Sequence, residues 1–300
     1  MRLNRFLAEG GLCSRRAADG LIRDGRVKVN GAAVVELGMQ VDPDTDVVQV
    51  DGRLVKPPAR KAVLLLNKPK GVLCTVTDPH GRRTVMDLVE FDLRVVPVGR
   101  LDADTTGALL LTNDGDLMNA LLHPSGHVPK EYIVLTDREL TEAELGRLAA
   151  GVKLEDGRTK PCEIERISRP GNRPRYRLVL TEGRNRQVRR MMEFLGAHVD
   201  RLHRRSIAGL SVEDLEPGQW RVLMGKEVDR LRKAAREARS GVGGTGNEPR
   251  SSGMDSTASS PRTREQGTGS PMAGTPARPT GRSARKGGSP GPRSGGRGGR

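Results

Sequence analysis

The stretch VGRLDADTTGALLLTNDGDL, residues 98–117, sets a carboxylate beside a buried strand. Residues 108–111 form an unbroken apolar run, which predicts a strand in the core, and the polar residues before them predict a tight turn. Asp102 is therefore expected on a loop next to hydrophobic surface. Taken alone, such an aspartate is more often a turn or helix-cap residue than a catalytic one. The local sequence also offers no partner that would make a two-carboxylate glycosidase site.

The segments around this stretch predict more strands than helices. Helices are expected at 141–151, where Thr141 and Glu144 form a capping pattern, and at 184–196, which Gly196 ends. Strands are expected at 63–66, 130–136, 162–168 and 175–183. Because the strands are not linked by regular βαβ units, the fold class is α+β with a mainly antiparallel sheet.

Residues 1–58 predict a small module of their own. One short helix is expected near the N-terminus and a second after Ser14, which stands at its N-cap position. The segment DGRVKVNG, residues 24–31, alternates as a strand does and ends in an Asn-Gly turn, and residues 46–50 supply a further strand. Two helices, a hairpin and this closing strand therefore make up the module.

Composition separates a tail from the folded part. From Ser240 onward the chain consists mainly of Gly, Ser, Pro, Thr and Arg, so it cannot bury enough apolar surface to offset the entropy of ordering. We therefore expect a module at 1–58, a larger domain at 59–239 and a disordered tail at 240–300. The formal net charge is +15, and both the tail and the folded part are basic. This charge favours a polyanionic partner, most often nucleic acid, over a merely solubilising surface.

The cysteines and histidines argue against disulfides and metal centres. Cys13, Cys74 and Cys162 are scattered without CxxC spacing, as is typical of reduced thiols, and the five histidines form no HExxH or similar pattern. No apolar stretch approaches the roughly 18 residues that a membrane helix needs, and no signal-peptide pattern begins the chain. We expect a soluble cytoplasmic protein with no metal and no membrane partner.

The string RLNRFLAEGGLCSRRAADGLIRDGRVKVNG, residues 2–31, resembles an S4 RNA-binding domain in residue type and spacing. On a single helix its arginines would more often form a solvated face. The resemblance implies that the second helix and the loop before it lie along structured RNA and contact phosphates rather than read bases. It assigns this RNA-binding role to Ser14, Arg15, Arg16, Arg23 and Lys28.

Five motifs in the larger domain share their order and spacing with one known family. They are NKPKGVL (67–73), VGRLDADTTGALLLTNDG (98–115), KEY (130–132), EGRNRQVRRMMEFLG (182–196) and VDRLHRRSIAG (199–209). Together with the S4 module, they resemble the RsuA/RluB family of ribosomal RNA pseudouridine synthases over about residues 1–225. The resemblance implies an isomerisation without a cofactor. The glycosidic C–N bond of a uridine breaks, the uracil turns, and C5 bonds to C1′ of the ribose.

The resemblance also implies the catalytic groups. The aspartate of GRLD, here Asp102, acts in the family either as a nucleophile at C1′ or as a base that removes the 2′ proton, and both roles stay open. Arg189 of the QVR motif is expected against Asp102, where it would keep the carboxylate ionised. Arg184, Arg186 and Arg190 are expected in solvent or on phosphate. No chemical role falls on Asp104.

The remaining site residues surround the target base. Tyr132 of KEY is expected to stack on it, because aromatic stacking holds a base taken out of its helix. Leu202 is expected on the other side of the pocket, although it could equally be an ordinary core residue. Lys68 and Lys70 form a basic turn that is expected to contact phosphate.

Two other functions fit parts of the sequence. A non-catalytic S4-domain factor for ribosome assembly would be equally basic, but it has no reason to keep Asp102, Tyr132 and Arg189 together. A synthase acting on tRNA or on small-subunit RNA would differ only in substrate. The KEYIVLT and EGRNRQVRRM segments favour a large-subunit target, so we expect 23S ribosomal RNA as the partner of a monomeric enzyme.

Overall fold

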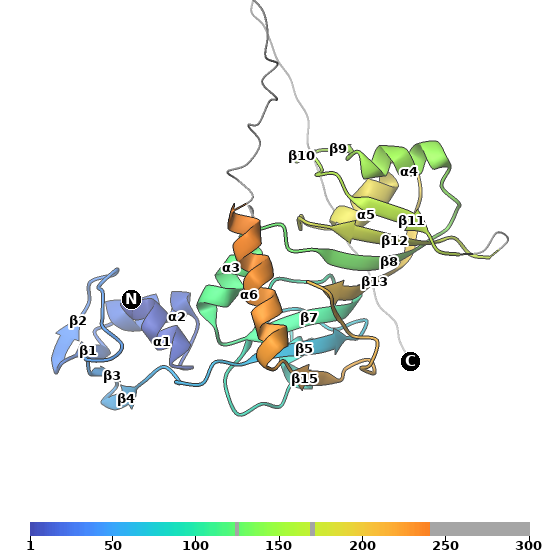
Figure 1. Cartoon of the computed structure of the whole chain (residues 1–300). Coiled ribbons are helices and arrows are strands. Elements are labelled where there is room, and N and C mark those ends of the chain that lie inside the picture. Colours follow the sequence, from blue (N-terminus) through green and yellow to red (C-terminus); the bar gives the residue numbers. More distant parts are fainter. Residues whose placement is uncertain (124–125, 169–171, 241–300) are drawn as a thin grey trace, which may run out of the picture. The chain divides into compact units, whose positions relative to one another are not determined.

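The computed structural model describes residues 1–123, 126–168 and 172–240, with side chains described to residue 236. The expected disordered tail at 240–300 lies outside the described residues, apart from Ser240 at the end of the last helix. Figure 1 shows the labelled elements.

The N-terminal module consists of two helices and a four-stranded sheet. Helices α1 (Leu3–Glu9) and α2 (Arg15–Arg23) precede strands β1 (Val27–Val29), β2 (Ala32–Val34), β3 (Val48–Val50) and β4 (Arg53–Val55). The strands are antiparallel in the order β2-β1-β3-β4. The Oγ of Ser14 accepts a 3.2 Å hydrogen bond from the amide of Ala17, so Ser14 is the expected N-cap of α2. The strand β4 is the one element of this module that the sequence did not predict.

The larger sheet crosses the rest of the fold in the order β11-β12-β8-β13-β7-β5-β15. Among the described strands of this sheet, all neighbouring pairs are antiparallel except β7 with β13, which is parallel. This arrangement confirms the α+β class with a mainly antiparallel sheet. Its strands are β5 (Val63–Lys68), β6 (Val96–Pro97), β7 (Thr106–Thr112), β8 (Lys130–Thr136), β11 (Glu163–Arg166), β12 (Arg175–Leu180), β13 (Val199–Ile207), β14 (Leu210–Ser211) and β15 (Trp220–Val222).

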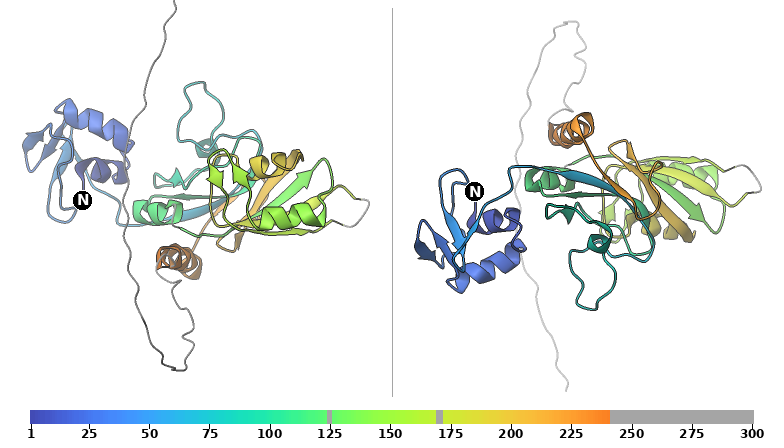
Figure 2. Two further views of the ribbon diagram at one scale, coloured as in Figure 1. Left: turned by 90° about the horizontal axis from the view of Figure 1, so that it is seen from above. Right: turned by 90° about the horizontal axis from the view of Figure 1, so that it is seen from below.

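Helices cover different parts of this sheet. Helices α4 (Glu142–Ala149) and α5 (Gln187–Glu193) pack on β8, β12 and β13, and the left view of Figure 2 looks onto these two helices. Helices α3 (Gly115–Leu122) and α6 (Gly225–Ser240) pack beside β5 and β7. The opposite face of β5 and β7 is covered by the short helix η1 (Val85–Leu88) and its flanking loops. Strands β5 and β7 are thus buried on both faces, which explains why their sequences are continuous apolar runs rather than alternating ones. A small hairpin of β9 (Lys153–Leu154) and β10 (Gly157–Arg158) follows α4.

Two expected boundaries are wrong in ways that matter for the site. The helix expected at 184–196 begins only at Gln187, because Arg186 adopts a left-handed backbone conformation with φ of 46°. The strand expected at 63–66 continues to Lys68, so this lysine ends a buried strand and does not belong to the exposed turn after it.

Candidate active site

Asp102 lies on the loop between β6 and β7, near the middle of the large sheet. The first residues of β7 pair with β13, Thr106 with His203 and Gly107 with Arg204. Strand β13 pairs with β8 on its other side. The loop therefore comes next to the part of the sheet that β8 and β13 form.

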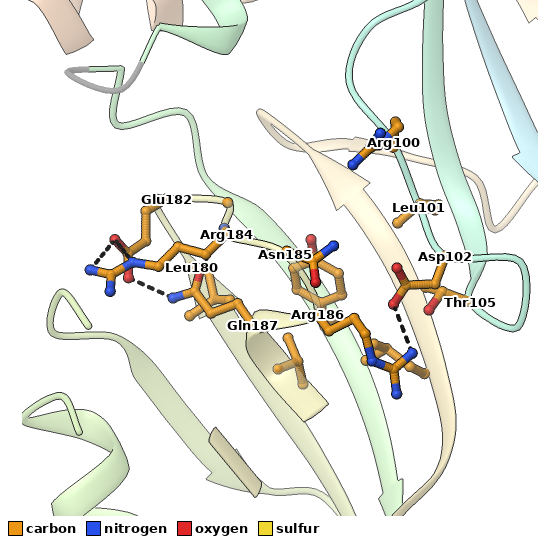
Figure 3. A pocket seen from close by; sticks show the side chains of 14 residues that line it. Arg100, Leu101, Asp102, Thr105, Leu180, Glu182, Arg184, Asn185, Arg186 and Gln187 are labelled. Atoms are coloured by element: carbon orange, nitrogen blue, oxygen red, sulfur yellow. Dashed lines mark hydrogen bonds and ion pairs between the residues drawn. The ribbon is translucent and has the colours of Figure 1, made fainter. Parts of the chain in front are cut away.

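A cavity of about 200 Å³ lies beside this loop (Figure 3). It is smaller than the pockets that hold drug-sized ligands and suits a group such as a single nucleobase. Fourteen residues from the loop, from β8, β12 and β13 and from the segment leading into α5 line it: Arg100, Leu101, Asp102, Thr105, Tyr132, Leu180, Glu182, Gly183, Arg184, Asn185, Arg186, Gln187, Val188 and Leu202.

The cavity brings Asp102 together with Tyr132 and Leu202, as expected. Tyr132 comes from β8, where it pairs with Arg204 of β13, and Leu202 comes from β13 itself. Both side chains are buried, and Leu101 and Val188 add further apolar surface. The site thus places buried apolar side chains beside a carboxylate that is 30% exposed, and polar side chains complete its lining.

The cation nearest to Asp102 is Arg186 and not Arg189. The Nη1 atom of Arg186 lies 3.7 Å from the Oδ2 atom of Asp102, an ion-pair distance too long for a hydrogen bond. In Figure 3 the Arg186 side chain extends toward Asp102 from the start of α5. Its left-handed backbone, uncommon outside glycine, makes it the residue at which the chain turns into this helix.

The expected contact between Arg189 and Asp102 is therefore wrong in this structure. Arg189 is buried on α5, and its Nη2 atom lies 2.6 Å from the Oδ2 atom of Asp104. Its Nη1 atom donates a 2.9 Å hydrogen bond to the carbonyl oxygen of Val199. Asp104, to which the sequence assigned no role, is thus the carboxylate partner of Arg189.

Lys68 also differs from its expected role as a phosphate contact. Its side chain is fully buried, and its Nζ atom donates to the carbonyl oxygens of Pro69, Ala103 and Thr105 at 3.0, 3.2 and 2.9 Å. Burial lowers the pKa of Lys68, although the charges of Cys74, Asp104 and Asp102 oppose that shift. A side chain so enclosed cannot reach a phosphate on the surface. Lys68 instead holds the loop that carries Asp102.

The segment 183–186 is fixed from the other side by Glu182. Its carboxylate accepts hydrogen bonds from the Lys160 amide, from Gln187 Nε2 and from Arg184 Nε, at 3.0, 2.5 and 3.2 Å. Arg184 also bonds the carbonyl groups of residues 156–158, and Arg190 pairs with Asp156 at 2.9 Å. The side chains of Arg184 and Arg190 therefore form contacts within the protein. Gly183 and Asn185 favour turns, and this signal could have predicted a loop here in place of the helix start expected at 184.

Thr105 is a further cavity residue that the sequence did not single out. Its side chain is buried, and its hydroxyl oxygen has no hydrogen-bond partner among the described residues. A buried hydroxyl without a partner is rare and marks a place where a ligand or water can bond.

The other expected RNA-binding residues lie on the surface. Lys70 is exposed just after β5. In the N-terminal module Ser14, Arg15, Arg16, Arg23 and Lys28 are all exposed. Their side chains are therefore accessible to a polyanion, as the S4 resemblance requires.

Within the described ranges, no group of three or more His, Cys, Asp or Glu side chains is placed to hold a metal ion. The helices of those ranges include none that is long and apolar enough to cross a membrane.

Comparison with known proteins agrees with this architecture. Residues 62–194 match the family model for RNA pseudouridylate synthase, and residues 1–47 match the S4 domain. An uncharacterized RNA pseudouridine synthase of Aquifex aeolicus is 43% identical over 239 residues, which cover 78% of this chain and 94% of that protein. The chain belongs to the RNA pseudouridine synthase family.

Other members of this family are also similar. The ribosomal large subunit pseudouridine synthase B of Bacillus subtilis is 40% identical, over 78% of this chain and 96% of its own length. The dual-specificity RNA pseudouridine synthase RluF of Escherichia coli is 38% identical, over 81% of this chain and 82% of its own length. A crystal structure of a pseudouridylate synthase matches 77% of this chain with a TM-score of 0.56 and 32% identity, and 99% of that chain is covered. The resemblance of the sequence to pseudouridine synthases is confirmed, and with it the S4 module of this RNA pseudouridine synthase.

Proposed function

We propose that this RNA pseudouridine synthase isomerises a uridine of 23S ribosomal RNA. The cavity beside Asp102 supports this proposal, because it brings that carboxylate together with the side chains of Tyr132 and Leu202 around a space that fits one base. Relatives at about 40% identity carry the name of large-subunit ribosomal RNA synthases, which supports the choice of RNA.

The reaction conserves every atom of the uridine. The bond from C1′ to N1 breaks, the uracil turns within the site, and a bond from C1′ to C5 forms. The proton on C5 is then lost, and N1 ends with a proton. Because nothing is oxidised or reduced overall, the isomerisation needs no redox cofactor. The enzyme must take the uridine out of its helix before the base can reach such a cavity.

Asp102 is the proposed catalytic residue, either as a nucleophile at C1′ or as a base at C2′. Both roles need an ionised carboxylate close to the ribose. Arg186 supplies the opposite charge at 3.7 Å. The buried hydroxyl of Thr105 is free to bond the substrate beside it.

Tyr132 and Leu202 are proposed to hold the uracil. An aromatic face and a branched apolar side chain can enclose a planar base while it turns, without fixing one orientation by hydrogen bonds. Both residues line the cavity together with Asp102.

The N-terminal module is proposed to position the RNA. Phosphates would be contacted by Arg15, Arg16, Arg23, Lys28 and Lys70. Ser14 would contact the RNA backbone while its hydroxyl still caps helix α2. We further propose that the enzyme acts as a monomer in the cytoplasm.

The test is a map of pseudouridines in ribosomal RNA from cells with and without this gene. One pseudouridine of 23S ribosomal RNA should disappear with the gene and return when the wild-type gene is supplied. A missing pseudouridine in 16S ribosomal RNA or in tRNA would overturn the choice of substrate. An unchanged map would overturn the proposed function.

A further inference from the structure

One hydroxyl group in the wall of the cavity has no hydrogen-bond partner among the described residues. It belongs to Thr105, which lines the cavity and is only 1% exposed. Of the cavity residues in the described ranges, Thr105 alone has a buried polar side-chain atom left without such a bond. The next residue shows the ordinary situation, because the Oγ1 atom of Thr106 forms a 2.9 Å hydrogen bond with Nδ1 of His203. A valine would fill the space of Thr105 without the cost of burying an unpartnered hydroxyl, so this group points to a ligand.

The backbone of Thr105 is fixed relative to Asp102. The Thr105 amide donates a 3.1 Å hydrogen bond to the carbonyl oxygen of Asp102. The Thr105 carbonyl oxygen accepts a 2.9 Å hydrogen bond from the Nζ atom of Lys68, whose side chain is itself buried. In Figure 3 the labelled Asp102 and Thr105 lie next to each other. The hydroxyl of Thr105 therefore has a set place beside the proposed catalytic carboxylate.

The position beside Asp102 limits which atoms of a uridine can meet this hydroxyl. Asp102 acts at C1′ or C2′ in its two proposed roles, and the oxygen atoms near these carbons are O4′, the 2′-hydroxyl and the O2 atom of uracil. The uracil turns during the isomerisation, so a hydrogen bond to its O2 atom would have to break midway. The ribose stays attached to the RNA strand and keeps its place. Of its two oxygens, only the 2′-hydroxyl can both donate and accept, and it is the group that distinguishes RNA from DNA.

We propose that the hydroxyl of Thr105 hydrogen-bonds the 2′-hydroxyl of the target uridine and so selects ribose over deoxyribose. The inference rests on the proposed function, since it names the part of the substrate that the cavity recognises beside Asp102. The contact holds the sugar with its reacting carbon toward the carboxylate. Its loss therefore lowers the reaction rate as well as the affinity for the nucleotide.

The test compares two RNAs that differ in one oxygen atom. One is the RNA fragment around the uridine that the pseudouridine map identifies, and the other has 2′-deoxyuridine at that position. Thr105→Val keeps the shape of the side chain and removes its hydroxyl. At saturating enzyme, this variant should convert the uridine fragment roughly tenfold more slowly than the wild type, and the 2′-deoxyuridine fragment at the wild-type rate. Comparing the two proteins on the same RNA cancels any effect of the missing oxygen on the chemistry itself.

Two further variants complete this test. Thr105→Ser keeps the hydroxyl and should retain most of the wild-type rate on the uridine fragment. Thr106→Val is the matched control, because the hydroxyl of Thr106 already bonds His203 and Thr106 does not line the cavity. Any change of rate in this control should be the same factor for both RNAs. All rates are measured at a temperature where circular dichroism shows each variant to be folded.

Two results of the rate measurement would overturn the inference. Equal slowing of both RNAs by Thr105→Val would show that the hydroxyl serves the uracil or the loop and not the ribose. Wild-type rates of Thr105→Val on both RNAs would show that the hydroxyl has no role in the reaction.

A second readout needs neither turnover nor a known target uridine. Uridine 5′-monophosphate and 2′-deoxyuridine 5′-monophosphate are titrated into the full-length protein, and binding is followed by the NMR signals of the methyl groups of Leu202, which also lines the cavity. The wild type should bind the ribonucleotide several-fold more tightly, and Thr105→Val should bind the two nucleotides equally. If cells show no pseudouridine made by this enzyme, the proposed function fails, and the nucleotide preference still decides on the Thr105 contact. Equal binding of both nucleotides by the wild type, or an unchanged preference in Thr105→Val, would overturn the inference.

Discussion

The ammonium nitrogen of Lys68 lies 2.9 Å from the carbonyl oxygen of Thr105, where the loop that carries Asp102 enters β7. Two more carbonyl oxygens, of Pro69 and Ala103, accept from the same nitrogen. The strand β5 and the loop that carries Asp102 are therefore joined by one buried cation.

Replacing this cation should destabilise the fold. In Lys68→Met, buried carbonyl oxygens lose their donor, and each such loss costs about 1–3 kcal/mol, partly offset because no ammonium need be buried. We expect the free energy of unfolding to fall by about 2–3 kcal/mol in urea denaturation. Lys70→Met, two residues along and exposed, should change it by about 0.5 kcal/mol or less. Equal effects of the two substitutions would show that Lys68 is not a support of the loop.

The ring of Tyr132 should matter more than its hydroxyl. Tyr132→Phe keeps the aromatic face, whereas Tyr132→Ala should lose roughly 1–3 kcal/mol of stacking on the flipped base. Single-turnover reactions at several enzyme concentrations separate binding from rate. Equal defects in both variants would mean that the hydroxyl is the important group.

Lys130 should make stability depend on pH above neutrality. Burial and the charges of Arg204 and Lys160 lower its pKa to about 8, although Glu182 opposes the shift, while an unfolded lysine titrates near about 10.4. Below pH 8 both states hold the proton and the folded state bears the cost of burying it. Between about 8 and 10.4 only the unfolded state holds it, so the free energy of unfolding rises with pH by about 3 kcal/mol.

The comparison with Lys130→Met isolates this contribution. The variant lacks the titrating amine, so its stability should exceed that of the wild type at pH 7 and lose this advantage by pH 10.5. Chemical denaturation of both proteins across that range gives the difference. Parallel curves would contradict a depressed pKa at Lys130.

A glycine is required where β7 meets β13. A Cβ atom on Gly107 would lie 2.2 Å from the carbonyl oxygen of Arg204, and φ at Gly107 is 104°, a conformation that other residues avoid. Gly107→Ala should therefore push the two strands apart and lower the melting temperature markedly. Gly146→Ala on α4 is the control, since a Cβ there meets nothing within 4 Å and should stabilise the helix by about 0.5–1 kcal/mol. Similar melting temperatures for the two variants would contradict this packing.

Local signals in the sequence predicted much of the fold. Ser14 and Thr141 cap α2 and α4 as expected, because a cap depends on residues only two or three positions apart. The strand expected at 130–136 is β8, since strong β-formers with flanking turns mark a strand without tertiary information. The helices α3 and α6 were not predicted.

The ion-pair partners of the charged side chains could not be predicted from the sequence, because they depend on tertiary structure. Arg186 and Arg189 are three residues apart, so both could reach the loop from one helix. The left-handed turn at Arg186 delays the start of α5, and it leaves Arg186 at the cavity while Arg189 lies inside against Asp104. Similarly, β5 is two residues longer than expected, so Lys68 lies in the core and not in the exposed turn where the sequence placed it.

The most direct test of the account is single-turnover conversion of a ribosomal RNA fragment by purified Asp102→Asn. This substitution keeps the size of the side chain and removes its charge, so the variant should fold and bind the RNA with nearly wild-type affinity. Pseudouridine formation should nevertheless fall below detection while the wild type converts the same fragment. Wild-type turnover by folded Asp102→Asn would contradict the assignment of catalysis to this carboxylate.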